Sequence, residues 1–136
     1  DLHHTRAHLY KAALEGIGYT IAQHFDILEE NDLPVKKVMV VGGGTKNPVW
    51  LQIVADILGR PVCTAKVTFG AAYGDAIMAA LSGGAYASWA ELEKVVRPDR
   101  IIQPNQDAHK VYAAQKPIFD QLYRNNKDLM RQVSSK

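Results

Sequence analysis

The sequence predicts an α/β fold in which helices pack on parallel strands, in a sheet that this chain leaves incomplete. Two short runs, 35–41 and 61–65, have the composition of buried strands. Apolar residues at helical spacing fill the segments before, between and after them. Strands that alternate with helices pair in parallel under right-handed crossovers. Because two strands rarely make a complete sheet, we expect the remaining strands upstream, outside this chain.

The first helix is expected at residues 9–30. Its apolar residues recur at steps of three and four: Leu9, Ala13, Ile17, Ile21, Phe25 and Leu28. Asn31 and Asp32 then end the helix. The run at 35–41 is nearly continuous in apolar character after Lys37, which predicts a strand buried on both faces.

Residues 48–58 predict a second helix, which Gly59 and Pro61 close. After the strand at 61–65, the small residues of 70–85 predict a third helix. Small side chains let a helix approach its neighbours, so we expect this helix to pack tightly in the core.

A short helix is expected at 88–96, with Ser88 as N-cap and Glu91 completing a capping box. We expect a loop at 98–104 and then a last helix at 106–132. One face of the last helix is apolar and the other mixes both signs of charge, so we expect it to dock on its own domain and not on a membrane.

The composition is that of one globular domain. Of 136 residues, 47% are hydrophobic and 22% charged. Sixteen Lys and Arg against fourteen Asp and Glu give a net charge of +2, without a basic stripe, so no nucleic acid is expected as a partner. No apolar run approaches the ~20 residues of a membrane span, so no membrane partner is expected either. The single cysteine, Cys63, favours a reducing, cytoplasmic location. The chain starts without Met, and we interpret it as a fragment.

Three adjacent glycines, Gly42, Gly43 and Gly44, separate the first strand from the second helix. The P-loop pattern fails because Pro48 stands where its Lys is needed. The dinucleotide pattern G-x-G-x-x-G fails because Asn47 stands at its last glycine. Asn is a favoured N-cap and Pro a favoured first helical residue, so capping alone can explain that pair. One glycine would serve a strained turn, and the excess indicates close approach of a ligand.

The run "VVGGGTKNPVWLQIVADILGRPV", followed by "FGAAYGDAIMAAL", resembles the carboxy-terminal domain of the FGGY carbohydrate kinases, most closely the xylulokinase (pentulose kinase) branch. The upstream "HTRAHLYKAALEGIGY" resembles the helix that precedes this signature in the family. Together these segments cover residues 4–82. Phe69 stands where the family often has Leu, and it keeps the apolar character.

The resemblance implies a kinase of the actin-like, ribonuclease H-like ATPase fold, in which two domains close on ATP and a sugar. Residues 1–136 would be the carboxy-terminal ATP-binding domain fragment. The family's nucleotide-binding positions correspond here to Gly42, Gly43, Gly44, Thr45 and Asn47. The glycines would lie against the ribose and the α-phosphate side of the nucleotide, the threonine would flank the site, and the asparagine would contact adenine.

No catalytic residue is expected in this chain, because in the family the general-base Asp lies in an upstream Gly-rich segment. Phosphoryl transfer also needs Mg²⁺, whose ligands we expect outside this chain, as we do most of the sugar pocket. Asp56 and Asp75 lie in helix bodies and are expected to be solvated or paired. No metal site is predicted, since His4 and His8 lack a third acidic or Cys ligand.

The resemblance therefore implies transfer of the γ-phosphate of ATP to a sugar hydroxyl by the full-length protein, with a pentulose such as xylulose as acceptor. The isolated fragment would be inactive. Kinases of glycerol, gluconate or another ketose remain alternatives. A non-catalytic actin-like nucleotide-binding module and a Rossmann-type cofactor domain are alternatives from other classes, and a homodimer is kept as an alternative assembly.

Overall fold

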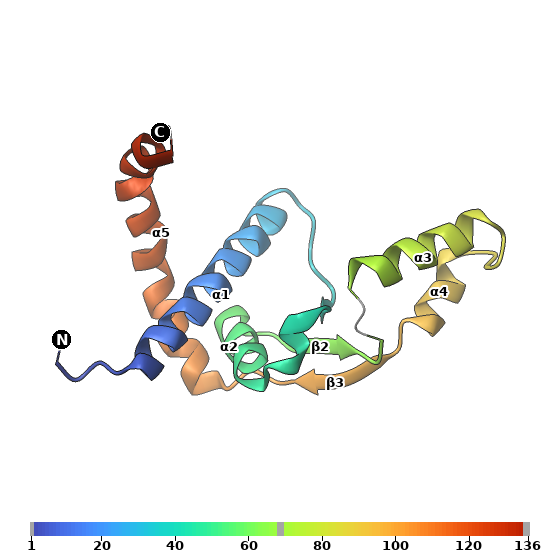
Figure 1. The fold of residues 1–136 in the computed structure, drawn as a ribbon, viewed down its shortest axis with the longest axis horizontal. Helices are drawn as coiled ribbons and strands as arrows, with labels where there is room; N and C mark the ends of the chain where they lie inside the picture. The colour runs from blue at the N-terminus through green and yellow to red at the C-terminus, as the bar shows by residue number, and fades with distance from the viewer. Residues whose placement is uncertain (1, 68–69, 135–136) are drawn as a thin grey trace.

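The computed structural model describes residues 2–67 and 70–134. Its helices are α1 (Arg6–Glu30), α2 (Pro48–Leu58), α3 (Ala71–Ser82), α4 (Trp89–Val95) and α5 (Gln106–Ser134), and a 3-10 turn, η1, spans Gly43–Lys46. Figure 1 shows an elongated molecule with α1, α2 and α5 at one end, the sheet in the middle, and α3 and α4 at the other end.

The described residues form a three-stranded sheet in the order β1 (Val38–Val40), β2 (Val62–Ala65), β3 (Pro98–Ile102). β1 and β2 are parallel, with Val38 opposite Val62, which confirms the predicted parallel pair. β2 and β3 are antiparallel, with Cys63 opposite Ile101. One core cluster lies between α2 and the sheet. It consists of Val54 and Ala55 of α2 and Val62 of β2, all of which are almost fully buried.

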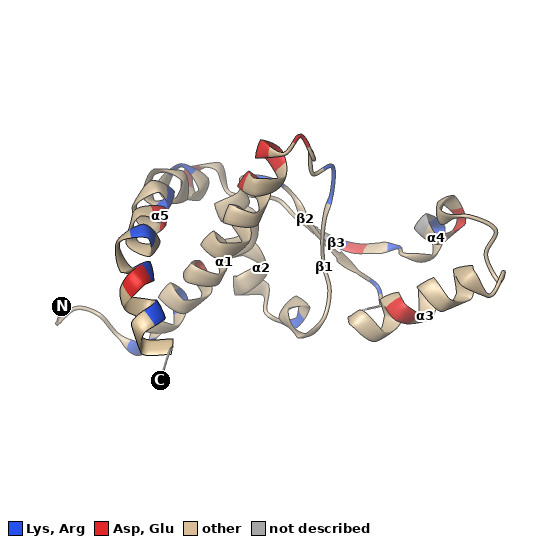
Figure 2. Ribbon diagram, turned by 90° about the horizontal axis from the view of Figure 1, so that it is seen from above, with Lys and Arg blue, Asp and Glu red and all other residues tan. Residues whose placement is uncertain are grey.

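The second core cluster joins α1, α2 and α5. It consists of Tyr19, Ala22, Ile53, Ile57 and Tyr112. The Tyr19 hydroxyl donates to the backbone oxygen of Tyr112 at 3.3 Å, and the Tyr19 ring stacks on Phe119 with centroids 5.1 Å apart. Tyr112 and Phe119 therefore dock the first half of α5 on the chain's own domain, which confirms the prediction in part. Other residues of the apolar face, among them Ile118 and Leu122, are exposed. Figure 2 shows Lys, Arg, Asp and Glu interspersed along the rest of α5.

Three expectations were wrong. The segment expected as a loop at 98–104 contains β3, whose residues Pro98 to Ile101 are exposed. A strand with so few buried residues has no apolar signal, and its proline stands at the first strand position, where no ladder bond is lost. α3 has no buried residue, because it lies beyond the sheet from α1, α2 and α5. β1 is half-buried along its whole length rather than buried on both faces, because it is an edge strand of the described sheet.

The capping prediction for α4 is confirmed only in part. Ser88 is its N-cap, as predicted, but the Ser88 side chain makes no capping bond. The Glu91 carboxylate accepts instead from the backbone N–H of Ala87 at 2.8 Å, one residue before the cap. Cys63 is buried in β2, between β1 and β3.

Candidate functional site

The candidate site lies where β1 ends and the chain turns into α2. Because β1 and β2 are parallel, their carboxyl ends meet at the same edge of the sheet. Each is followed by a glycine turn and a helix: Gly42 precedes η1 and α2, and Gly70 is the N-cap of α3. In open α/β sheets, ligands bind in the crevice outside the carboxyl ends of the strands.

The three glycines of the turn differ in what the protein requires of them. Gly42 has φ +82°, a left-handed conformation that side chains rarely adopt. A Cβ on Gly44 would lie 2.4 Å from Cζ3 of Trp50, so the indole ring excludes a side chain there. Gly43 has neither constraint: its φ is not in the left-handed region, and a Cβ built on it meets no atom within 4 Å. The fold therefore explains two of the three glycines and leaves Gly43 open.

Thr45 holds the turn together. It is 4% exposed, and its hydroxyl donates to the Gly42 carbonyl at 2.7 Å. Its own backbone oxygen accepts from Nη2 of Arg100, on β3, at 2.9 Å. The side chain of Thr45 thus faces into the turn and fixes its shape, and the residue's backbone is tied to the sheet.

Asn47 is the N-cap of α2. Its Oδ1 accepts from the backbone N–H groups of Val49 at 3.1 Å and Trp50 at 3.2 Å, which confirms the capping interpretation of the Asn-Pro pair. Its Nδ2 donates to the hydroxyl of Tyr10, on α1, at 3.1 Å. An amide nitrogen carries two hydrogens, so one Nδ2–H is left to donate to a ligand while the oxygen is committed to the helix.

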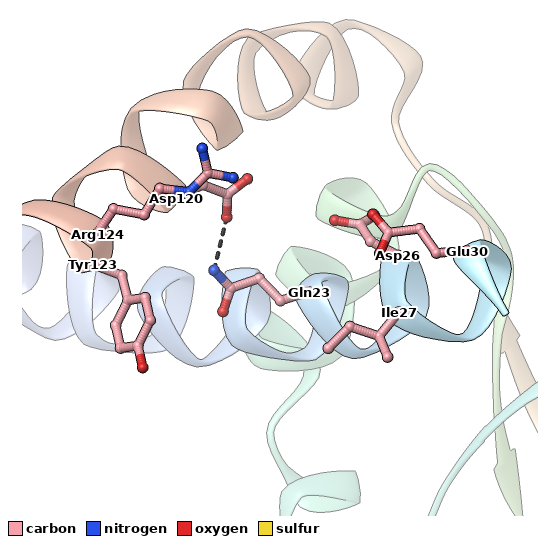
Figure 3. Close-up of a pocket in the computed structure, with 7 residues that line it drawn as sticks. All are labelled: Gln23, Asp26, Ile27, Glu30, Asp120, Tyr123 and Arg124. Carbon is pink, nitrogen blue, oxygen red and sulfur yellow. Dashed lines mark hydrogen bonds between the residues drawn. The ribbon is translucent and has the colours of Figure 1, made fainter. Parts of the chain in front are cut away.

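A hollow of about 330 Å³ lies away from the glycine turn, between α1 and the middle of α5 (Figure 3). Gln23 donates to Asp120 across it at 2.7 Å. Lys116 pairs with both Asp26 and Asp120, the second at 3.1 Å. The pKa of Asp120 is lowered despite its partial burial, because Gln23 and Lys116 both donate to the carboxylate. Because Lys116, Asp26 and Asp120 pair with one another, we interpret the residues around this hollow as a polar contact between α1 and α5.

Asp56 and Asp75, the two aspartates in helix bodies, differ in burial. Asp75 is exposed on α3. Asp56 is 6% exposed, so of its two expected roles, solvated or paired, the structure shows the paired one. Its Oδ1 accepts from Nε2 of Gln52 and from the backbone N–H of Asn105, both at 2.7 Å. Asn105 in turn caps α5 through its own side chain, so Asp56 anchors the start of that helix.

Within the described residues, no group of three His, Cys, Asp or Glu side chains is placed to hold a metal ion. The rings of His4 and His8 lie edge to face with centroids 5.4 Å apart, and Nδ1 of His8 accepts from the backbone of Thr5. None of the helices in 2–67 or 70–134 is long and apolar enough to cross a membrane. Phe69 lies outside the described residues.

Sequence reasoning missed two residues that contact the turn, Tyr10 and Arg100. Tyr10 is 37 positions before Asn47, and Arg100 is 55 positions after Thr45. Neither belongs to a local motif, and Arg100 lies in the strand that was expected to be a loop. Only the pairing of β3 with β2 brings Arg100 to the turn.

The fold and the turn define an α/β domain with a glycine-rich strand-to-helix turn at the carboxyl ends of parallel strands. The chain belongs to the FGGY family of carbohydrate kinases: the model of that family's C-terminal domain matches residues 1–83. This match confirms the resemblance found in the sequence, and with it the fold, the carboxy-terminal part of an actin-like ATPase domain.

Individual relatives are sugar and polyol kinases. The chain is 30% identical to the xylulose kinase of Bacillus subtilis (strain 168) over 133 residues, 97% of this chain and 27% of the relative. It is 33% identical to a glycerol kinase of Rhodopirellula baltica over 108 residues, 79% of this chain and 20% of the relative. The crystal structure of xylulose kinase from Rhodospirillum rubrum matches with a TM-score of 0.80 and 32% identity, over 96% of this chain and 27% of that one. The chain spans about a quarter of the length of the xylulose kinases it matches.

Proposed function

We propose that residues 1–136 are the carboxy-terminal, ATP-binding domain of a two-domain sugar kinase that transfers the γ-phosphate of ATP to a sugar hydroxyl. The acceptor we favour is a pentulose such as xylulose. Xylulose kinases recur among the relatives and among the similar structures, which supports this choice. A glycerol kinase among the relatives keeps glycerol as the second candidate acceptor.

The observation that carries the nucleotide assignment is Gly43. The protein itself needs no glycine there, since the residue is exposed and a Cβ meets no atom within 4 Å. A bare backbone at the end of a strand, directly before a helix, lets a phosphate approach the main chain of the turn closely. Gly43 and the glycines beside it would lie against the ribose and the α-phosphate side of ATP, with the helix dipole of α2 favouring the anion.

Asn47 would contact adenine through its remaining Nδ2–H. Because Oδ1 is bonded to two N–H groups of α2, the side chain offers the base a donor only, which suits a ring nitrogen acceptor of a purine. Thr45 would flank the site and stabilise the turn through its hydrogen bond to the Gly42 carbonyl.

This chain's residues would bind and orient the nucleotide, and they would not perform proton transfer. Asp56 is committed to Asn105 and Gln52. Asp75 stands alone on the exposed face of α3, with no metal-binding group among the described residues around it. The base that accepts the sugar hydroxyl proton, and the ligands of Mg²⁺, would be supplied by the rest of the kinase.

ATP titration by calorimetry of the full-length protein tests the proposal. We expect Gly43→Val to abolish ATP binding and leave the melting temperature within a few degrees, because the new side chain occupies ligand space and meets no protein atom. Gly16→Val on α1 is the matched control, since Gly16 also has an open Cβ position and no left-handed φ. Unchanged ATP affinity in Gly43→Val would reject the assignment of the turn. Tight binding of NADH without ATP binding would favour a Rossmann-type cofactor domain.

The non-catalytic alternative is separated by a different measurement. A kinase releases ADP in proportion to the sugar consumed, whereas a nucleotide-controlled assembly module binds ATP with no dependence on sugar. ADP formation that requires xylulose supports the first acceptor, and formation that requires glycerol supports the second.

A further inference from the structure

β3 contains an irregularity next to the glycine turn. Cys63 of β2 pairs with Ile101, but Ala65, two residues on, pairs with Pro98 rather than with Asp99. One extra residue of β3 is therefore accommodated opposite Thr64, which is a β-bulge. Bulges bend a strand locally and redirect a side chain, and they are frequent next to active sites.

The bulged backbone of β3 is anchored to a buried side chain of β2. A bulge leaves a backbone group without its ladder partner, and here the N–H of Arg100 donates to Oγ1 of Thr64 at 3.2 Å. Thr64 is 1% exposed, so this hydroxyl is held among buried side chains. The backbone of Arg100 is thus fixed at a defined point beside β2.

From this point the Arg100 side chain reaches the glycine turn. Its Nη2 donates to the backbone oxygen of Thr45 at 2.9 Å. Its Nε lies 3.6 Å from a carboxylate oxygen of Asp99, in a pair about half exposed on both sides, and such surface pairs contribute little. The contact with Thr45 is the one that joins two elements far apart in the sequence.

We propose that Arg100 is a positioning residue for the nucleotide: from the bulge in β3 it holds the carbonyl of Thr45 and so keeps the Gly42–Lys46 turn in the shape that receives the phosphate side of ATP. The nucleotide part of this inference rests on the proposed function. The restraint on the turn does not, because the bonds that define it are present without any ligand.

The turn is held by two kinds of bond: bonds within the turn, and the bond from Arg100 that links it to the sheet. Thr45 closes the turn through its hydroxyl and its N–H, both of which donate to the Gly42 carbonyl. Those bonds shape the turn but do not fix it relative to β2. Arg100 supplies that second restraint, and a preorganised turn binds its ligand with less loss of conformational entropy.

The test compares Arg100→Gln, Arg100→Lys and the control Arg97→Gln in the full-length protein. Arg97 lies directly before β3, and its side chain bonds only locally, to the backbone oxygen of Lys94. Two quantities are measured: amide hydrogen exchange at Thr45 and Asn47 without nucleotide, and the dissociation constant for ATP. In Arg100→Gln we expect about tenfold faster exchange at both amides and about tenfold weaker ATP binding, the size of one charge-assisted hydrogen bond.

Arg100→Lys keeps a charged donor without the planar fork, so we expect intermediate values for both quantities. Arg97→Gln is expected to match the unchanged protein. Unchanged exchange in Arg100→Gln, or the same change in Arg97→Gln, would overturn the inference. Faster exchange at Thr45 and Asn47 in a protein that never binds ATP would uphold the restraint on the turn and reject the proposed function instead.

Discussion

Gly70 and Gly42 lie close together: a Cβ built on Gly70 would make an ordinary van der Waals contact, at 3.7 Å, with the Cα of Gly42. The two residues follow neighbouring parallel strands, so the two glycine turns lie close together at the carboxyl edge of the sheet. Both have a positive φ, +82° for Gly42 and +65° for Gly70. The edge at which we place the nucleotide is therefore formed by two bare backbones that face each other.

Gly70→Ala is expected to destabilise the protein by about 1–2 kcal/mol, because alanine is strained in the left-handed region. It is also expected to weaken ATP binding, since the new methyl group would fill the space between the two glycine turns. Gly84→Ala is the control: φ is +78° at Gly84, but a Cβ there meets no atom within 4 Å. Urea unfolding should show a similar loss for both variants, and calorimetry should show weaker ATP binding for Gly70→Ala alone. Equal ATP affinities would contradict a role for Gly70 at the site.

Asn47 allows helix capping and ligand binding to be separated. Asn47→Ala removes the cap of α2 and should cost about 1 kcal/mol in urea unfolding. Asn47→Asp keeps an oxygen for Val49 and Trp50, so stability should be retained, while the Nδ2 donor is lost. We expect weaker ATP binding in both variants. Normal ATP affinity in Asn47→Asp would show that the asparagine only caps the helix.

Replacing Asp56 is expected to destabilise the protein more than replacing Asp75, the other aspartate in a helix body. Asp56→Ala leaves the N–H of Asn105 without its partner beside a buried site and should cost about 2–4 kcal/mol in urea unfolding. Asp56→Asn retains an acceptor oxygen and should cost less. Asp75→Ala, at an exposed position, is expected to change stability by no more than about 0.5 kcal/mol. Equal losses for Asp56→Ala and Asp75→Ala would contradict the anchoring role.

Alkaline pH should weaken the contact between α1 and α5. Burial, together with the nearby charge of Glu15, raises the pKa of Tyr19 to about 12 from its ordinary value of 10.0. Because the folded pKa is above the unfolded one, the stabilising contribution is complete below pH 10 and is lost as pH rises from 10 through 12. The expected loss in the free energy of unfolding is on the order of 2 kcal/mol.

Tyr19→Phe should flatten this alkaline decline, measured by urea unfolding at intervals from pH 9, below the titration window, to about 11.5, within it. Tyr123→Phe, at an exposed position on α5, serves as the control and should leave the decline unchanged. An identical slope in Tyr19→Phe and in the unchanged protein would show that another group causes the loss.

Local signals in the sequence were sufficient to predict the helix and the strands around the turn. The bounds of α2, Pro48 to Leu58, follow from an N-cap, a proline and a closing glycine, each of which acts within a few residues. The parallel pair of β1 and β2 follows from the alternation of strands and helices. The same local reasoning failed for β3 and α3, because an exposed strand carries no apolar pattern and small residues are equally compatible with a buried or an exposed helix.

By itself the sequence determined the family and the strand–turn–helix unit. It also indicated the five positions at which we propose that the nucleotide binds: Gly42, Gly43, Gly44, Thr45 and Asn47. Those features depend on chemistry that is local in the chain: missing side chains, a cap and a helix start. Only the tertiary structure decided which glycine is free for a ligand, because the demand on Gly44 comes from the position of the Trp50 ring and that on Gly42 from its φ. Only the tertiary structure likewise brought Tyr10 and Arg100 to the turn, since contacts between residues 37 and 55 positions apart depend on how α1 and β3 pack, which no local pattern records.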